Sequence, residues 1–595
     1  MNVLGISGLN DSEAFKRQEF PELPRSSARI CQGFDAAAAL LTDRGVAAAA
    51  AEERFSRIKA TGAFPVQAIQ FCLRNAGIGP GDIDVIAHGF DYRSYQDHYA
   101  QQPRMARQYR SVYSREAQIE LLEMHFPQVR NWADRFVQVP HHVAHAASAY
   151  YPSGFDEALI IVADGMGEHE GLTIAVGEGD RIRLVQQIPS IHSLGIFYSL
   201  FTMYLGFEFN MDEYKVMGLA PYGDPRRHFK QVMSLITLHD DGTHTIPLLF
   251  RNVTDIERET YGGSLAVLTD MFGPARLPEA EITRHHHDIA AALQAALQTA
   301  LLHLLRSCRD RTGAKRLAMA GGVALNCTAN GVIKRSGLFR DMFVQPAAGD
   351  DGTALGAALF ARHQRGEPIP RTRQGVPLWG PDVDPERTSA ALAAHDGLSV
   401  SEFAQESQLL EAVAGLLDQG SIVGWCQGRM EFGPRALGAR SIIADPRDPQ
   451  MRARINALVK KREDFRPFAP AVIASAADQY FDITPGDTAL FEHMLCVTQV
   501  REPWRERLPA ITHVDGSARV QTVSESGNGR FYRLLAAFGE RTGLPMLLNT
   551  SFNVRGQPIV CNEREAVQTF LDAGLDALVI GDRLVRRADS TRATS

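Results

Sequence analysis

Two stretches of the chain, residues 35–54 and 157–189, repeat one pattern of apolar runs and polar turns. The first is an apolar run, a turn at 42–45 and a second apolar run. The second is an apolar run ending at residue 163, followed by two more runs joined by a turn at 177–180. Each pattern predicts consecutive strands with a hairpin, and helical sequence follows both. The repeat predicts a duplicated α/β core; the alternative is two unrelated hairpins.

Apolar residues then follow the 3.6-residue period of a helix from about 284 to 308, which predicts a core helix. Next come a predicted strand over 316–320, the glycines Gly321 and Gly322, and a helix start near Asn326. Paired glycines let the main chain approach a ligand, and helix-start amides can face phosphate or ribose oxygens. Such turns also occur without ligands, so the pattern alone identifies no site.

The periodicity lapses over residues 363–387, which are rich in proline, glycine and charge. A helix near 405–418 and a buried strand over 421–425 follow. We predict two α/β domains, at residues 1–370 and 371–595.

The composition of the 595-residue chain is that of an ordinary enzyme, with 45% hydrophobic residues, 22% charged residues and a net charge of −7. This charge argues against a dedicated binder of nucleic acid or membranes, and we expect no segment with the apolar length of a membrane span. Seven cysteines, none spaced as Cys-x-x-Cys, suit reduced thiols, and the N-terminus lacks the features of an export signal. We expect a cytoplasmic enzyme.

The run Pro-His-His-Val-Ala-His indicates a metal site, because His141 and His145 share one helix face. Two remote carboxylates, Asp164 and Asp350, could complete the ligand shell. His142 and His145 also share a face, so the spacing leaves the choice of histidines open. The alternative is that all three histidines only form hydrogen bonds. Two imidazoles and two carboxylates suit borderline divalent ions such as Fe(II), Zn(II) or Mn(II).

The second predicted domain has a basic cluster, with ten Arg or Lys residues against five Asp or Glu between Arg429 and Arg466. Guanidinium groups suit phosphate oxygens, and the interleaved apolar and turn residues favour a pocket over a solvated surface patch. A nucleic-acid groove is disfavoured, because no aromatic residues are interleaved. Ser551 and Asn553 follow a predicted strand and could orient an anion or a carbonyl.

Five motifs, in order along nearly the whole chain, resemble those of the O-carbamoyltransferase family, which includes nodulation-factor and antibiotic-tailoring enzymes. They lie at residues 53–59, 214–223, 431–440, 465–470 and 549–553. The resemblance implies a duplicated actin/sugar-kinase/heat-shock fold, similar to the tRNA threonylcarbamoyl-transfer subunit, that binds iron and a nucleotide. It implies a second, YrdC-like α/β domain that activates carbamoyl phosphate with ATP and Mg. The resemblance is also compatible with a homodimer.

The resemblance also implies roles for individual residues. The implied metal ligands are His141, His145, Asp164 and Asp350. The implied nucleotide and cofactor contacts are Gly165, Gly321, Gly322, Asn326, Ser551 and Asn553. The implied catalytic cations are Lys460, Arg462, Arg435 and Arg440, which would offset the repulsion between ATP and an anionic carbamoyl donor.

One position departs from the family pattern. Where members of the family that it resembles carry His-Asp-Ala-Ser, the run in this chain is Gly33-Phe34-Asp35-Ala36-Ala37, so that Phe34 stands in place of the histidine. Phenylalanine cannot replace an imidazole that contacts an adenylate or accepts a proton. Asp35 remains a candidate base, the alternative being that it orients its loop. Together with the charged segment from Asn10 to Gln32, this change leaves the acceptor unidentified.

The predicted function is therefore ATP-dependent carbamoylation of a small-molecule hydroxyl, with carbamoyl phosphate as donor. A carbamoyl adenylate would form in the C-terminal domain and react at the metal site of the N-terminal domain. The alternatives are a small-molecule kinase of the same superfamily and a non-catalytic or tRNA-modification assembly subunit.

Overall fold

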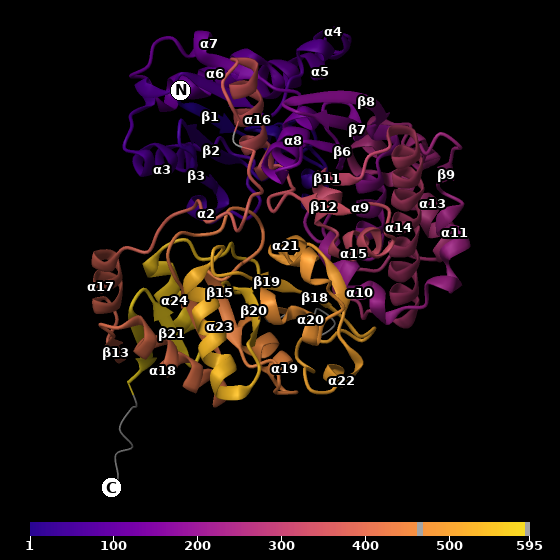
Figure 1. Ribbon diagram of the computed structural model, residues 1–595. Coiled ribbons are helices and arrows are strands. Elements are labelled where there is room, and N and C mark those ends of the chain that lie inside the picture. The colour runs from indigo at the N-terminus through magenta and orange to yellow at the C-terminus, as the bar shows by residue number, and fades with distance from the viewer. Residues whose placement is uncertain (370, 461–467, 589–595) are drawn as a thin grey trace. The chain divides into compact units, whose positions relative to one another are not determined.

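The computed structural model describes residues 1–369, 371–460 and 468–588 (Figure 1). These residues form two compact units. The first comprises residues 1–56 and 60–374, and the second comprises 57–59 and 375–595. The division after residue 374 lies within the proline- and glycine-rich stretch 363–387.

The N-terminal unit begins with a five-stranded sheet in the order β3-β2-β1-β4-β5. β1, β2 and β3 form an antiparallel meander, and β4 and β5 continue from β1 in parallel. Its interior is almost entirely apolar, as expected for a sheet covered on both faces. The strands are β1 Val3–Ile6, β2 Ala37–Thr42, β3 Gly45–Ala51, β4 Val85–His88 and β5 Phe136–Gln138.

A second five-stranded sheet repeats this topology in the order β12-β11-β6-β7-β8. β6, β7 and β8 form the meander, and β11 and β12 continue in parallel from β6. The prediction of a duplicated α/β core is therefore confirmed, and the topology is that of the actin/sugar-kinase/heat-shock fold. The strands are β6 Glu157–Ala163, β7 Glu170–Glu178, β8 Arg181–Pro189, β11 Arg316–Ala320 and β12 Asp341–Val344.

Two small-residue helices, α8 His141–Tyr150 and α16 Asp351–Gln364, pack closely against each other (Figure 1). α16 also packs on β1 and β2, and α8 packs on β6 and β11. Glycine is required at two of these contacts. A Cβ on Gly356 of α16 would lie 1.8 Å from the Ala144 carbonyl oxygen of α8, and one on Gly5 of β1 would lie 1.8 Å from the Ala354 carbonyl oxygen. Main-chain contact therefore fixes α8 relative to α16.

A helical subdomain is inserted between β8 and β11. Its longest helix, α14, packs against its neighbours α9, α10, α11 and α15. Among the described residues, α14 alone is long and apolar enough to span a membrane, which the sequence reading did not expect. However, 72% of its most apolar window is buried inside the unit, as in a core helix. The helices of the insertion are α9 Leu194–Tyr204, α10 Glu213–Leu219, α11 Phe229–Met233, α12 Asp255–Thr260, α13 Gly262–Phe272 and α14 Arg284–Thr312, and α15 Cys327–Arg335 follows β11.

The C-terminal unit is an α/β domain whose main sheet is mixed and has the order β13-β22-β21-β14-β15-β20-β16-β19, and β17 Val497–Gln499 and β18 Ser517–Arg519 form a second, two-stranded sheet. α18 Glu406–Asp418 and α23 Gly529–Thr542 cover a large apolar cluster on the main sheet. The neighbouring strands β14 and β21 are parallel, so their carboxyl ends meet at one edge. The strands of the main sheet are β13 Leu398–Glu402, β14 Val423–Cys426, β15 Arg440–Ala444, β16 Ala469–Ile473, β19 Gln521–Val523, β20 Met546–Ser551, β21 Ala577–Ile580 and β22 Arg583–Arg587.

Candidate functional site

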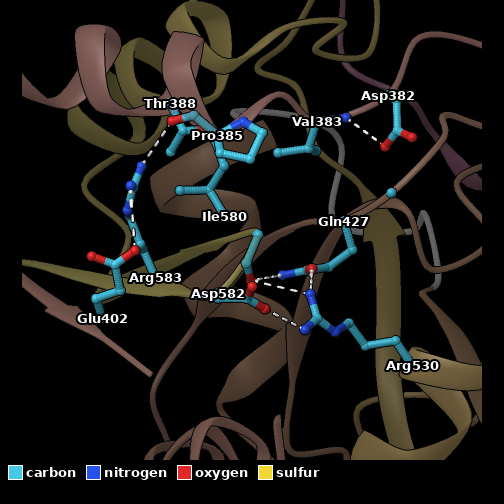
Figure 2. Close-up of a pocket in the computed structure, with 12 residues that line it drawn as sticks. Asp382, Val383, Pro385, Thr388, Glu402, Gln427, Arg530, Ile580, Asp582 and Arg583 are labelled. Atoms are coloured by element: carbon cyan, nitrogen blue, oxygen red, sulfur yellow. Dashed lines mark hydrogen bonds and ion pairs between the residues drawn. The ribbon is translucent and has the colours of Figure 1, made fainter. Parts of the chain in front are cut away.

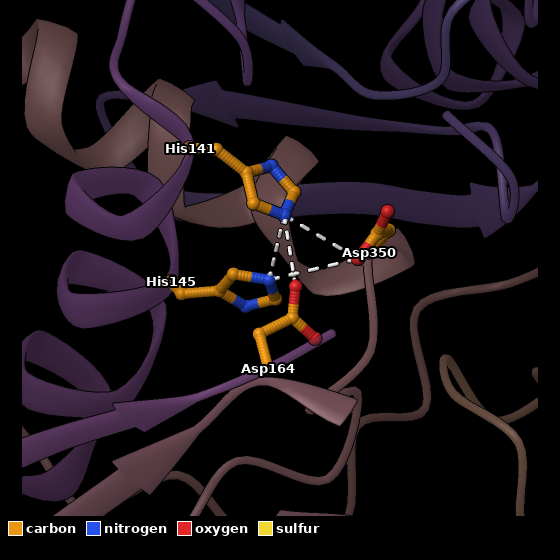
Figure 3. Close-up of side chains that lie close together, drawn as sticks. All are labelled: His141, His145, Asp164 and Asp350. Atoms are coloured by element: carbon orange, nitrogen blue, oxygen red, sulfur yellow. Dashed lines mark hydrogen bonds and ion pairs between the residues drawn. The ribbon is translucent and has the colours of Figure 1, made fainter. Parts of the chain in front are cut away.

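Four side chains predicted to bind a metal converge in the N-terminal unit (Figure 3). His141 and His145 lie one turn apart on α8, Asp164 follows β6, and Asp350 immediately precedes α16. One ligating atom of each lies within 4.8 Å of those of the other three. The fixed contact between α8 and α16 thus brings together groups that are distant in the sequence.

The distances within the cluster suit one ion. His141 Nε2 lies 3.1 Å from His145 Nε2, 3.5 Å from Asp164 Oδ2 and 3.4 Å from Asp350 Oδ1. Ligand atoms bound to one cation at about 2.0–2.2 Å lie roughly 3.0–3.5 Å from one another. His141 Nδ1 lies 3.0 Å from the Gly89 carbonyl oxygen and must donate to it, which leaves Nε2 facing the other donors. These electron pairs repel one another unless a cation or a proton lies among them.

The electrostatics of the cluster agree with its geometry. Burial lowers the pKa of His141, but the carboxylates of Asp350 and Asp164 outweigh burial and raise this pKa well above its usual value. Burial raises the pKa of Asp164 and of Asp350, but the facing histidines outweigh it and lower both. The cluster therefore attracts positive charge, and its two imidazoles and two carboxylates fit a borderline divalent metal ion.

His142 does not join this cluster. Its Nδ1 lies 2.8 Å from the Thr173 hydroxyl oxygen on β7, and burial lowers its pKa to about 3. The structure thus brings His141 and His145, but not His142, to the two carboxylates.

The sequence analysis missed a carboxylate that supports the cluster. Glu168, just before β7, accepts hydrogen bonds from the backbone amides of His141 and Asp91 at 2.9 and 2.6 Å. The ring of Phe90 stacks on the His141 imidazole, with centroids 4.1 Å apart. Both contacts fix the position of His141 at the start of α8. The run Asp-Gly-Met-Gly-Glu after an apolar strand was the only signal for Glu168 in the sequence.

The predicted glycine loop serves the carboxylate Asp164. The Gly322 amide donates to Asp164 Oδ1 at 2.8 Å. Gly321 has φ +89, and a Cβ there would lie 2.3 Å from the Ala163 carbonyl oxygen, so only glycine fits. Gly165, also predicted to contact the cofactor, has open space around its Cα.

Asn326, predicted to contact the nucleotide, forms hydrogen bonds within the protein. Its Oδ1 caps α15 by accepting from the Ala329 amide at 2.9 Å. Its side-chain amide also exchanges two 3.0 Å hydrogen bonds with the side chain of Gln294. Asn326 therefore fixes the start of α15, and its polar atoms are engaged within the protein rather than offered to a nucleotide.

The candidate base Asp35 adopts a left-handed backbone conformation with φ 53. A Cβ built on Gly349 would lie 3.9 Å from Asp35 Oδ2 and 3.4 Å from Asp351 Oδ1, so Asp35 faces the turn that carries Asp350. Burial and the neighbouring carboxylates, Asp351 foremost, raise the pKa of Asp35 well above its usual value, and Arg29 opposes this rise. A carboxyl group with a raised pKa suits proton transfer near neutral pH.

In the C-terminal unit, Arg440 has a structural environment. Its guanidinium group is fully buried and donates to the carbonyl oxygens of Gln427, Gly428, Ala439 and Pro381 at 2.9–3.1 Å. Arg440 therefore holds the loop after β14, and its catalytic role stays a prediction. Glu431, which the sequence analysis did not single out, accepts three backbone amide hydrogen bonds from residues 437–440 and shapes the same loop.

The other residues predicted to activate the carbamoyl donor lie in several parts of the C-terminal chain. Ser551 ends β20 and donates a 2.7 Å hydrogen bond to Asn553 Oδ1, so these two side chains do lie together. Arg435 is half-buried. Lys460 is the last residue of a helical turn, Asn456–Lys460, and Arg462 lies outside the described residues.

A separate pocket of about 250 Å³ lies in the C-terminal unit, where β14 and β21 end (Figure 2). The side chains that line it include Gln427, Arg530, Asp582 and Arg583. Arg530 pairs with Asp582 and donates to Gln427 Oε1 at 2.7 Å. The charges of Arg530 and Asp582 in this pocket therefore largely neutralise each other. None of the predicted activation residues is among the described residues that line this pocket.

Comparison with known proteins identifies the family of this chain. The family model for the carbamoyltransferase N-terminus matches residues 31–359, and that for the carbamoyltransferase C-terminus matches residues 414–587. The chain belongs to the carbamoyltransferase family. This carbamoyltransferase is therefore a transferase enzyme.

Named relatives include proteins of nodulation and of antibiotic synthesis. The nodulation protein NolNO of Sinorhizobium fredii is 41% identical over 563 residues, which cover 93% of this chain and 79% of NolNO. The 3'-hydroxymethylcephem-O-carbamoyltransferase of Amycolatopsis lactamdurans is 36% identical over 277 residues, 46% of this chain and 49% of the relative.

Among solved structures, component A of (R)-2-hydroxyglutaryl-CoA dehydratase from Acidaminococcus fermentans covers 62% of this carbamoyltransferase and 100% of its own chain. It is 14% identical, with a TM-score of 0.32, a likeness too distant to inform function.

Proposed function

We propose that this carbamoyltransferase is an ATP-dependent O-carbamoyltransferase that acts on a hydroxyl group of a small molecule. Carbamoyl phosphate would react with water to give carbamate and phosphate. The carbamate oxygen would then attack the α-phosphorus of ATP, which gives carbamoyl adenylate and pyrophosphate. Attack of the acceptor hydroxyl on the carbamoyl carbon would release AMP and form the carbamate ester. Membership of the family and the named O-carbamoyltransferase relative support the transfer itself.

The observation that carries the transfer step is the cluster of His141, His145, Asp164 and Asp350. These residues would hold a divalent ion, which supplies Lewis-acid polarisation of the carbamoyl oxygen and neutralises the departing phosphate. Iron(II) is the ion that the resemblance favours, and the donor set suits zinc and manganese as well. Asp35, beside the Asp350 turn, would accept the proton of the acceptor hydroxyl.

Adenylation is assigned to the C-terminal domain, predicted at residues 371–595. Lys460, Arg435 and Arg462 would bind the phosphates of ATP and the anionic donor, with a Mg²⁺ ion bound to the nucleotide. Ser551 and Asn553 would orient the donor. Transfer is assigned to residues 1–370, and Gly165 and the Gly321–Gly322 turn would lie near the nucleotide there.

Separate assays of the two half-reactions test this proposal. The purified enzyme should catalyse pyrophosphate–ATP exchange that depends on carbamoyl phosphate, and should form AMP when incubated with hydroxyl compounds. Lys460→Ala should abolish exchange, because the cation that stabilises the transferring phosphorus is lost. His141→Ala should preserve exchange and block transfer, because the metal loses a ligand.

Several results would contradict the proposal. Absence of exchange in the wild-type enzyme would remove the adenylation step. Formation of ADP and a phosphorylated acceptor, detected by mass spectrometry, would instead indicate a kinase. Loss of exchange in His141→Ala with retention in Lys460→Ala would mean that the two domains have been assigned in the wrong order.

A further inference from the structure

Arg29 is a largely enclosed cation, and two of its nitrogens have no hydrogen-bond partner among the described residues. It closes a short 3₁₀ helix, Arg25–Arg29, and its side chain is 14% exposed. Its Nε and Nη2 atoms are enclosed, and neither has a hydrogen-bond partner within the described part of the chain. Its nearest carboxylate is Glu208, with Oε1 3.6 Å from Arg29 Nε, beyond hydrogen-bond distance.

Phe34 holds this guanidinium group in place. The Cζ atom of Arg29 lies 4.3 Å from the centre of the Phe34 ring. Phe34 is buried and immediately precedes Asp35, the candidate base. The guanidinium group is therefore fixed beside the residue that faces the Asp350 turn. Because the family model begins to match at residue 31, Arg29 belongs to a part of this chain that lies outside the match.

An enclosed guanidinium group is unfavourable when its N–H groups have no acceptors, because their hydration is lost and nothing replaces it. The group is planar and presents paired donors that match a carboxylate or a phosphate. Stacking on an aromatic ring leaves the edge of the guanidinium free to donate. An oxyanion in this position would satisfy the unpaired nitrogens.

We propose that Arg29, held on Phe34, binds an anionic group of the acceptor, so that the acceptor is a hydroxyl compound that carries a carboxylate or a phosphate. This inference rests on the proposed function, since it names the substrate class of the same transfer site. The binding energy of the anion would position the acceptor hydroxyl beside Asp35 and the metal cluster. Phe34, where the family has histidine, would thus serve acceptor recognition.

The test uses the full-length enzyme, with inorganic phosphate and acetate as probes in calorimetric titrations. Arg29→Gln should weaken the binding of both probes about 10–100-fold, the usual range for a charge-assisted pair. Arg29→Lys should weaken it less, because the charge remains and only the paired geometry is lost. Arg17→Gln is the matched control, since Arg17 lies in the same N-terminal segment and is exposed and paired with Glu13. Equal affinity in Arg29→Gln and Arg17→Gln would overturn the proposal.

Glu208→Gln tests the same site in the opposite direction and decides the question if Arg29→Gln does not fold. Removal of this competing carboxylate should tighten phosphate binding several-fold. Weaker or unchanged binding would overturn the proposal, because a purely structural Arg29 would give no gain.

AMP is a third probe, which separates the acceptor from the adenylate as the source of the anion. Its affinity should be the same in Arg29→Gln and wild type, and a loss that matches the phosphate loss would overturn the assignment to the acceptor. Pyrophosphate exchange by the wild-type enzyme tests the proposed function separately. Its absence would refute adenylation whatever Arg29 binds.

Discussion

Replacement of Gly356 by alanine should separate the two helices that carry the metal cluster. The new Cβ would lie 1.8 Å from the Ala144 carbonyl oxygen, whereas ordinary contact begins at 3.4 Å. α8 and α16 must therefore move apart by roughly 1.5 Å. Ala144 lies between His141 and His145, and Asp350 is at the start of α16, so the same movement displaces the histidines from this carboxylate.

This displacement is large for a metal site. Protein ligands lie within about 0.2 Å of their preferred distance from the ion, so one ion could not keep the histidines and Asp350 together. We expect the affinity for Mn(II) to fall at least about 10–100-fold, as it does when the support of a metal ligand is removed. Overpacking should also lower the free energy of unfolding by about 1–3 kcal/mol.

Calorimetric titration of the metal-free enzyme with Mn(II), and thermal unfolding with and without Mn(II), measure both effects. Gly81→Ala is the matched control, because a Cβ there meets nothing within 4 Å and the residue belongs to the same unit. If Gly356→Ala bound Mn(II) as tightly as Gly81→Ala did, the helix contact would not position the ligands and the explanation given for the cluster would be wrong.

Three further variants test other parts of the argument. Glu168→Gln should weaken Mn(II) binding about 10-fold in titrations, because the variant lacks the carboxylate that holds the first turn of α8. Unchanged Mn(II) affinity would contradict a supporting role for Glu168. Burial raises the pKa of Glu168 to about 7, so ionisation opposes folding. The contribution of Glu168 to the stability of the metal-free enzyme should therefore be greatest below the usual carboxyl pKa and be lost as the pH rises through about 7, and the difference in stability between wild type and Glu168→Gln should follow this dependence. Since the pKa of Asp35 is raised, transfer should decline with falling pH well above pH 4, and Asp35→Asn should remove most activity and this limb of the pH–rate profile. Arg440→Lys should lower the free energy of unfolding by about 2–4 kcal/mol in denaturant titrations because buried carbonyl groups lose donors, and normal stability with lost exchange would support its catalytic role instead.

The sequence predicted the features of this fold that depend on local pattern. The repeated hairpins led to two sheets of identical topology, because strand alternation and turn residues are read from neighbouring positions. The choice between His141 and His142 as the partner of His145 could not be made in this way. Residues three and four apart share a helix face equally well, and the outcome depended on Thr173, a hydroxyl on another strand.

Asn326 and Arg440 show why chemical type is weaker evidence than environment. Asn326 and Arg440 have side chains that suit nucleotide recognition, and both belong to regions where such recognition was expected. However, the partners of Asn326 include Gln294, 32 residues earlier, and those of Arg440 include Pro381, 59 residues earlier. Burial among fixed partners removes a polar group from binding, and nothing near either residue in the sequence indicates that burial.

Arg29 illustrates the converse. Its neighbours in the sequence gave no reason to single it out, and its position on Phe34 became apparent only when the fold enclosed both residues. Arg440 donates from both terminal nitrogens to four carbonyl oxygens and stabilises the loop around it, although its Nε has no partner among the described residues. Arg29 has two enclosed nitrogens without partners in the described part of the chain, and it therefore has donors left for a ligand. Phe34 then has a physical consequence, because the face of an aromatic ring can support a guanidinium group and leave its N–H groups free for a ligand.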